Sequence, residues 1–113
     1  MTLPRVARLR RRREFLLVQQ RGRRLYSGEV LVLAVDTGGT RPRIGITVSS
    51  KVANAVGRNR VKRWVREAFR AQQADLPAVD LVVVARAGAL AMGIAGARRA
   101  LAQACEKLRG TNA

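Results

Sequence analysis

Residues 54–72 have the sequence NAVGRNRVKRWVREAFRAQ, and this stretch decides the fold that we expect for the chain. At 100° per residue, its apolar side chains gather on one side of a helix and its basic side chains on the other. Asn54 has a side chain of the type that caps helix N-termini. We therefore predict an amphipathic helix from about Ala55 to Gln72, whose core side is formed by Val61, Trp64, Val65 and Ala68, with Phe69 at its edge.

The opposite side of this predicted helix is almost purely cationic. Like charges at helical spacing cost about a few tenths of a kcal/mol per pair, and Glu67, as an i+4 partner of Arg63, is the one acid that relieves them. A helix that merely faces solvent usually mixes charge signs, so we interpret this side as a surface for phosphate groups. The positive N-terminal end of the helix, near Arg58, adds to the attraction. The row comprises Asn59, Arg63, Arg66 and Arg70, with Lys62 beside it.

The charge of the whole chain points to a polyanionic partner. Its 113 residues include 23 Lys and Arg against 7 Asp and Glu, a net charge of +16. Binding to nucleic acid offsets this self-repulsion and releases condensed counterions. One cysteine and no histidine exclude an ordinary zinc site, and the acidic residues are too scattered for a two-metal nuclease. Because histidine is also missing as a general base, we expect no catalytic residue in the protein.

Two further helices are predicted from apolar spacing. The first covers residues 12–20 and stops at Gly22, because glycine commonly follows a helix in the left-handed conformation. The last covers residues 93–108 and keeps one apolar side. Cys105 lies on that side, which favours a core position over a nucleophilic role. Residues 1–11 are expected to form a basic arm without regular structure.

Three strands are predicted from apolar runs and alternation. Residues 29–36 and 80–86 are apolar stretches typical of buried strands, whereas residues 43–49 alternate as a half-exposed strand does. Turn residues at 37–40 join the strands at 29–36 and 43–49, so we predict an antiparallel hairpin there. The basic segment that includes Arg23 and Arg24 is expected to be a connection.

Residues 49–63, SSKVANAVGRNRVKR, resemble the signature of the bacterial ribonuclease P protein family. That signature is approximately S-K-K-x-G-N-A-V-x-R-N-R-x-K-R, followed by R-E-x-F-R, which is REAFR at residues 66–70 here. Ser50 and Ala53 depart from the family's common Lys and Gly. Arg8-Leu9, Phe15 and Gly22 also fit in order, as do Arg43-Ile44-Gly45 and the predicted strand at 80–86, so the resemblance covers nearly the whole chain.

The resemblance implies one domain over residues 1–113, with an α+β two-layer sandwich. The family has a mainly antiparallel sheet of about four strands with three helices, in the order αβββαβα. Its motif helix connects two parallel strands by a left-handed crossover, whereas the usual connection is right-handed.

The resemblance also implies a function. In this family the protein subunit binds a catalytic RNA and the 5′ leader of precursor tRNA, and assists the endonucleolytic removal of that leader. The RNA carries the hydrolysis with Mg²⁺ that it mainly binds itself, and the protein alone is inactive. By matching positions, the RNA-binding residues are Lys51, Asn54, Arg58, Asn59, Arg60, Lys62, Arg63, Arg66 and Arg70.

The family binds the leader in a cleft between the first helix and the open face of the sheet. The matching residues are Phe15, Gln19, Leu33 and Arg43. Phe15 either offers a stacking surface to a base or pins the first helix to the core, and the sequence leaves both interpretations open. Relatives often carry aromatic residues at positions 19 and 33, so leader contact here is expected to rely more on Arg43 and on polar groups.

Other classes of protein share some of these features. A ribosomal RNA-binding protein has the same charge and size but lacks the long motif. A transcription factor would place the basic helix in a helix-turn-helix, whereas here it lies between two predicted strands. The chain shows no signal peptide, membrane span or broad apolar helix face, so we expect a cytoplasmic protein without membrane contact or an obligatory protein partner.

Overall fold

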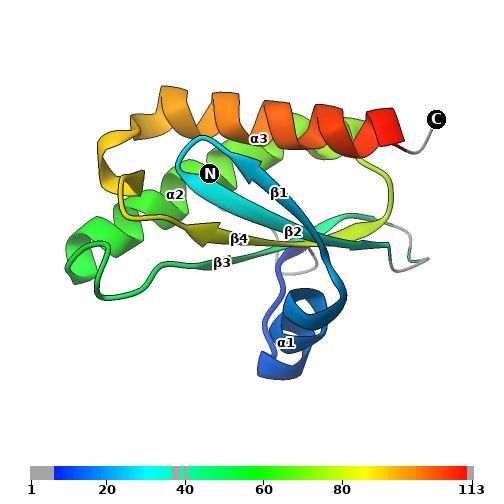
Figure 1. Ribbon diagram of the computed structural model, residues 1–113, viewed down its shortest axis with the longest axis horizontal. Helices are drawn as coiled ribbons and strands as arrows, with labels where there is room; N and C mark the ends of the chain where they lie inside the picture. Colours follow the sequence, from blue (N-terminus) through cyan, green and yellow to red (C-terminus); the bar gives the residue numbers. More distant parts are fainter. Residues whose placement is uncertain (1–6, 37–38, 40, 112–113) are drawn as a thin grey trace.

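The computed structural model describes residues 7–36, 39 and 41–111, and Figure 1 shows their arrangement. One four-stranded mixed sheet carries three helices, which confirms the α+β class and the order αβββαβα. Short 3₁₀ turns at Gln73–Asp75 and Ala89–Ala91 flank the last strand. The helices and strands are α1 (Arg12–Arg21), β1 (Arg23–Ser27), β2 (Val30–Asp36), β3 (Arg43–Thr47), α2 (Ala55–Gln72), β4 (Val79–Ala85) and α3 (Gly93–Thr111).

The strand order is β1-β2-β4-β3, so the predicted hairpin between residues 29–36 and 43–49 is wrong. β4 lies between those two strands, antiparallel to β2 and parallel to β3. It takes the central place because nearly all of its side chains are buried, whereas those of β3 are partly exposed. Of the turn predicted at residues 37–40, Thr37, Gly38 and Thr40 lie outside the described residues.

The segment predicted as a basic connection is instead the edge strand β1, which pairs with β2. Arg23 and Arg24 are exposed, whereas Leu25 and Ser27 face the core. The alternation covers too few residues to stand out in the sequence, and charged side chains are typical of exposed sheet edges.

Helices α2 and α3 pack against each other on one face of the sheet (Figure 1). The predicted apolar side of α2 is confirmed, because Val61, Val65 and Phe69 are fully buried and Trp64 packs against them. Leu101 and Cys105 occupy the matching side of α3. As the connection between the parallel strands β3 and β4, α2 occupies the place that the resemblance implied, and the left-handedness of this crossover stays a prediction.

Helix α1 covers part of the opposite face of the sheet (Figure 1), where Val18 packs on Leu33 and Val82. Helix α1 ends before Gly22 as predicted, but Gly22 does not have the left-handed conformation that we expected. Gly22 has an extended backbone with φ −71°, and a Cβ there would collide with the carbonyl oxygen of Val18. The glycine therefore permits close approach between the chain and the end of α1.

Residues 7–11 of the N-terminal arm pack against the sheet. Leu9 is buried, and its N–H donates to the carbonyl of Ile44 at 2.8 Å, so this segment lies alongside β3. Residues 1–6 lie outside the described residues. The arm thus adds a further border to the open face of the sheet.

Cys105 should be nearly unreactive in the folded chain. The residue is 1% exposed, and burial raises the pKa of its thiol to about 11 from 9.0, which leaves about a hundredfold less thiolate. We expect iodoacetamide at pH 8 to label the native chain at least that much more slowly than the chain unfolded in guanidinium. Equal labelling rates would contradict this burial.

Candidate nucleic-acid interface

The predicted RNA-binding residues lie together along α2 and the loop that enters it. The structure has the predicted division of α2 into a basic and an apolar side, since Asn59, Arg60 and Arg63 are exposed and the apolar side is buried. The remaining predicted RNA-binding residues of α2 are half-buried: Arg58, Lys62, Arg66 and Arg70. The structure therefore places a continuous basic surface on α2.

Two of the predicted contacts have roles inside the protein. The side chain of Asn54 accepts a hydrogen bond from the N–H of Gly57 at 2.9 Å, which confirms the predicted helix cap. Arg58 donates to the carbonyl of Ala53 at 3.0 Å, which ties the entering loop to the first turn of α2. Both residues therefore fix the start of the basic helix.

Glu67 pairs with Arg70 at 3.4 Å, and the predicted pairing with Arg63 is wrong. Both partners are about one-third exposed, so this pair adds little stability. In the described parts of the chain, Arg60, Arg63 and Arg66 form no ion pair. Their positive charge is thus available to an external anion.

A small pocket of about 80 Å³ lies between α2 and β3, and three cations line it. Arg8 reaches it from the N-terminal arm, and Lys62 and Arg66 reach it from α2. The Nε of Arg8 is buried and has no hydrogen-bond partner among the described residues. Burial, and then the charge of Arg8, lowers the pKa of Arg66. A buried donor and clustered cations both favour a bound anion, and phosphate is the anion that nucleic acid supplies.

A second, wider cleft of about 420 Å³ opens between α1 and β3. Phe15 lines this cleft and the small pocket, so its ring stands where the two meet. The ring lies directly over Gly45, where a Cβ would collide with it. Phe15 is therefore a partly exposed wall of the cleft as well as a contact between α1 and the sheet, and both predicted interpretations fit its position. The wider cleft is lined by Arg10, Arg12, Phe15, Leu16, Gln19 and Thr47.

The structure brings Phe15 and Gln19 to this cleft but not Leu33. Leu33 is 3% exposed and lies beneath α1, so its prediction as a cleft residue is wrong. The physical reason is its place on β2. Leu33 points to the face that α1 covers, and Val18 closes over it.

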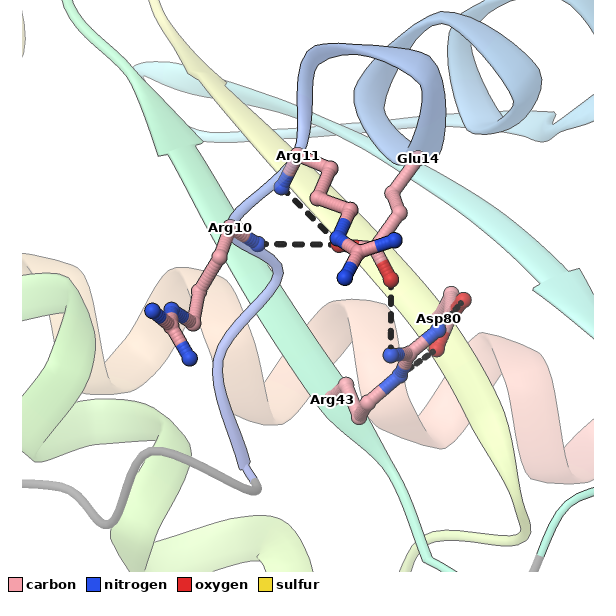
Figure 2. Close-up of polar contacts among 5 residues, drawn as sticks. All are labelled: Arg10, Arg11, Glu14, Arg43 and Asp80. Carbon is pink, nitrogen blue, oxygen red and sulfur yellow. Dashed lines mark hydrogen bonds and ion pairs between the residues drawn. The ribbon is translucent and has the colours of Figure 1, made fainter.

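Arg43 is held by two carboxylates, as Figure 2 shows. Its Nε and Nη2 donate to Asp80 at 2.9 and 2.7 Å, and its Nη1 donates to Glu14 at 2.9 Å. Glu14 in turn accepts from the backbone N–H groups of Arg10 and Arg11 at the start of α1. This network clamps α1 to β3 and β4. The guanidinium of Arg43 is therefore engaged within the protein, and the contact of Arg43 with the leader stays a prediction.

The electrostatics of this clamp follow from its geometry. The N–H of Arg11 chiefly lowers the pKa of Glu14, and the N–H of Arg10 and the Arg43 guanidinium lower it further, while burial acts against them. The hydrogen bond to Asp80 is the largest cause that raises the pKa of Arg43. Glu14 and Arg43 are therefore both charged at neutral pH. Sequence patterns missed the clamp because its members come from three segments that only the fold brings together.

The described residues lack two further features. No group of three or more His, Cys, Asp or Glu side chains in these residues is placed to hold a metal ion. None of the helices within the same residues has the length and apolar character needed to cross a membrane.

Replacement of Glu14 by Gln should loosen α1 in a pH-dependent way. Because folding lowers the Glu14 pKa, its stabilisation is complete above the unfolded-state value of about 4.3 and is lost as the pH falls through the lower folded-state value. We expect E14Q to lower the free energy of unfolding by about 1 kcal/mol at pH 7 and by less than that at pH 3. Urea unfolding at both pH values measures this, and E106Q, on the exposed side of α3, is the control. An equal loss at both pH values would contradict the clamp.

Comparison with known proteins agrees with this geometry. A family model described as Ribonuclease P matches residues 3–109. A ribonuclease P protein component from Escherichia coli (strain K12 / DH10B) is 40% identical over 109 residues, which cover 96% of this chain and 88% of the relative. The RNase P protein from Thermotoga maritima has a TM-score of 0.79 at 34% identity, with 88% of this chain and 96% of that chain covered. The Staphylococcus aureus RNase P protein has a TM-score of 0.80 at 28% identity, with 91% and 94% covered. With its motif helix and its fold both matched, the chain belongs to the ribonuclease P protein family.

Proposed function

We propose that this chain is the protein subunit of a ribonuclease P ribonucleoprotein, in which it binds the catalytic RNA and the 5′ leader of precursor tRNA. The observation that carries the proposal is the basic surface of α2, whose opposite side is buried in the core. The surface continues into a pocket with three cations and a buried donor that has no partner within the described part of the chain. A duplex-DNA reader is disfavoured, because α2 connects two neighbouring strands of a sheet rather than two helices.

The exposed side of α2 binds the phosphate backbone of the catalytic RNA. Guanidinium groups bind phosphate through two parallel hydrogen bonds, and this geometry favours Arg over Lys. Arg60 and Arg63 are exposed and have no carboxylate partner in the described chain, so they bind phosphate without first breaking an ion pair. The Asn54 cap keeps the first turn of α2 in place and thereby orients Arg58 and Asn59.

The leader of the precursor lies in the cleft beside Phe15. A base stacked on an exposed aromatic ring contributes about 1–3 kcal/mol, largely without regard to sequence. The pocket with Arg8, Lys62 and Arg66 is adjacent, so one nucleotide places its base against Phe15 and a phosphate among these cations. Mature tRNA has no leader, so these contacts favour substrate over product.

The chemical step belongs to the RNA, and the Mg²⁺ it requires is held mainly by the RNA. Bound Mg²⁺ supplies a Lewis acid for the phosphate and activates the attacking water. The two carboxylates of the clamp, Glu14 and Asp80, are engaged by Arg43, and Glu14 also accepts from backbone N–H groups. The part of this chain in the reaction is to bind and orient RNA.

The purified protein should therefore cleave precursor tRNA only together with its RNA. We expect no product from the protein alone and accurate 5′ maturation when the RNA is added at low Mg²⁺. Gel analysis of end-labelled precursor provides the measurement, with the RNA alone as the reference. Cleavage by nuclease-free protein without RNA would overturn the assignment of chemistry to the RNA.

The Arg63→Glu substitution should weaken binding to the catalytic RNA and flatten its salt dependence. The logarithm of the binding constant falls as the logarithm of the salt concentration rises, and each lost phosphate contact makes this negative slope less steep by about 0.7–0.9. Arg98→Glu makes the same charge change at an exposed position on α3 and should leave the slope near the wild-type value. Filter binding over a salt series distinguishes them, and equal slopes for R63E and the wild type would count against the role of α2.

A further inference from the structure

The open face of the sheet carries a row of side chains that leads away from the Phe15 cleft. In the strand register Tyr26 lies opposite Leu31, Leu31 opposite Val84, and Val84 opposite Thr47. Strand alternation puts all four on the face that carries α1, since their neighbours Leu25, Val32 and Val83 face α2 and α3. Thr47 is itself part of the wider cleft, so the row starts there.

Helix α1 covers this row only in part. It packs chiefly over Leu33 and Val82, which are fully buried and lie two residues away along β2 and β4. Leu31 and Val84 stay partly exposed, and Tyr26 at the far edge is 55% exposed. The row is therefore an accessible strip beside α1.

The far end of the strip is aromatic and basic. The guanidinium of Arg86 lies 5.6 Å from the centre of the Tyr26 ring. The N–H of Arg86 donates to the carbonyl of Glu29 at 2.9 Å and thereby continues the ladder between β4 and β2. Arg24 is exposed on β1, two residues before Tyr26 and on the same face. An aromatic ring flanked by two arginines matches what single-stranded RNA-binding surfaces use: a face for stacking and cations for the backbone.

We propose that the leader continues from the Phe15 cleft across the sheet to a second base-binding position at Tyr26 and Arg86. The inference rests on the proposed function, because it extends the path of the same strand. Thr47 and Tyr26 are three strand spacings apart, about 14 Å. A four-stranded sheet with exposed aromatics commonly stacks two or three bases over such a face. The positive charge at the far end favours RNA over an apolar protein partner as the occupant.

The test uses the reconstituted ribonucleoprotein and two precursors, one with a leader of about two nucleotides and one of about ten. Tyr26→Ala should weaken binding of the long-leader precursor about fivefold or more and leave the short-leader precursor unchanged, because a short leader ends within the Phe15 cleft. Tyr26→Phe should retain the wild-type affinity. Arg86→Ala should weaken the long-leader complex, whereas Arg98→Ala on α3 should not. Equal effects of Tyr26→Ala on both precursors, or none on either, would overturn the second position.

A second measurement tests the position at Tyr26 without a substitution there, so its outcome does not depend on whether a variant folds. A photoreactive uridine about eight nucleotides upstream of the cleavage site should crosslink to β1 near Tyr26, and one next to that site should not. Crosslinking of the distal uridine elsewhere would also overturn the inference. Phe15→Ala separates the proposed function from the second position, since it should weaken the binding of both precursors. If Phe15→Ala and Arg63→Glu weaken binding and Tyr26→Ala does not, the second position alone fails; if none of them does, the proposed function fails.

Discussion

The structure depends on burial of β4 from both sides. Leu81 and Val83 face α2 and α3, while Val82 faces α1, and all three are fully buried. A strand without a polar face is stable only between two covering layers, so helices are required on both faces of the sheet. Because α2 covers one face with its apolar side, its basic residues must point outward. The constraint that closes the core therefore also creates the surface that we assign to RNA.

The position of α1 follows from a buried acid. Asp80 lies in the middle of the fold with its side chain 6% exposed, and a buried carboxylate without a partner is costly. Arg43 lies opposite it in the register of β3 and β4 and provides that partner. Through Glu14 the same guanidinium holds the first turn of α1, which places Phe15 over Gly45. The clamp pairs both carboxylates with one guanidinium, and the cationic side chains that line the cleft itself are Arg10 and Arg12.

The basic surface of α2 was predictable because it is local. Helical periodicity, a capping asparagine and a long motif all lie within residues 49–70, and the structure places them as predicted. The small pocket was less predictable, because Arg8, Phe15 and Arg66 come from three segments. Leu33 shows the same limit, since whether it lines the cleft or lies beneath α1 depends on where α1 packs. No pattern within β2 alone contains that information.

By itself, the sequence determined the helices, three of the four strands, the net charge of +16 and the separation of apolar from basic residues on α2. These features depend on neighbours within a few residues, so local spacing is sufficient to establish them. The tertiary structure decided that β4 lies between β2 and β3, that β1 pairs with β2, and that Arg43 binds Asp80. Strand order minimises exposed apolar surface over the whole chain at once, and the partners of charged residues are fixed only when that order brings distant segments together.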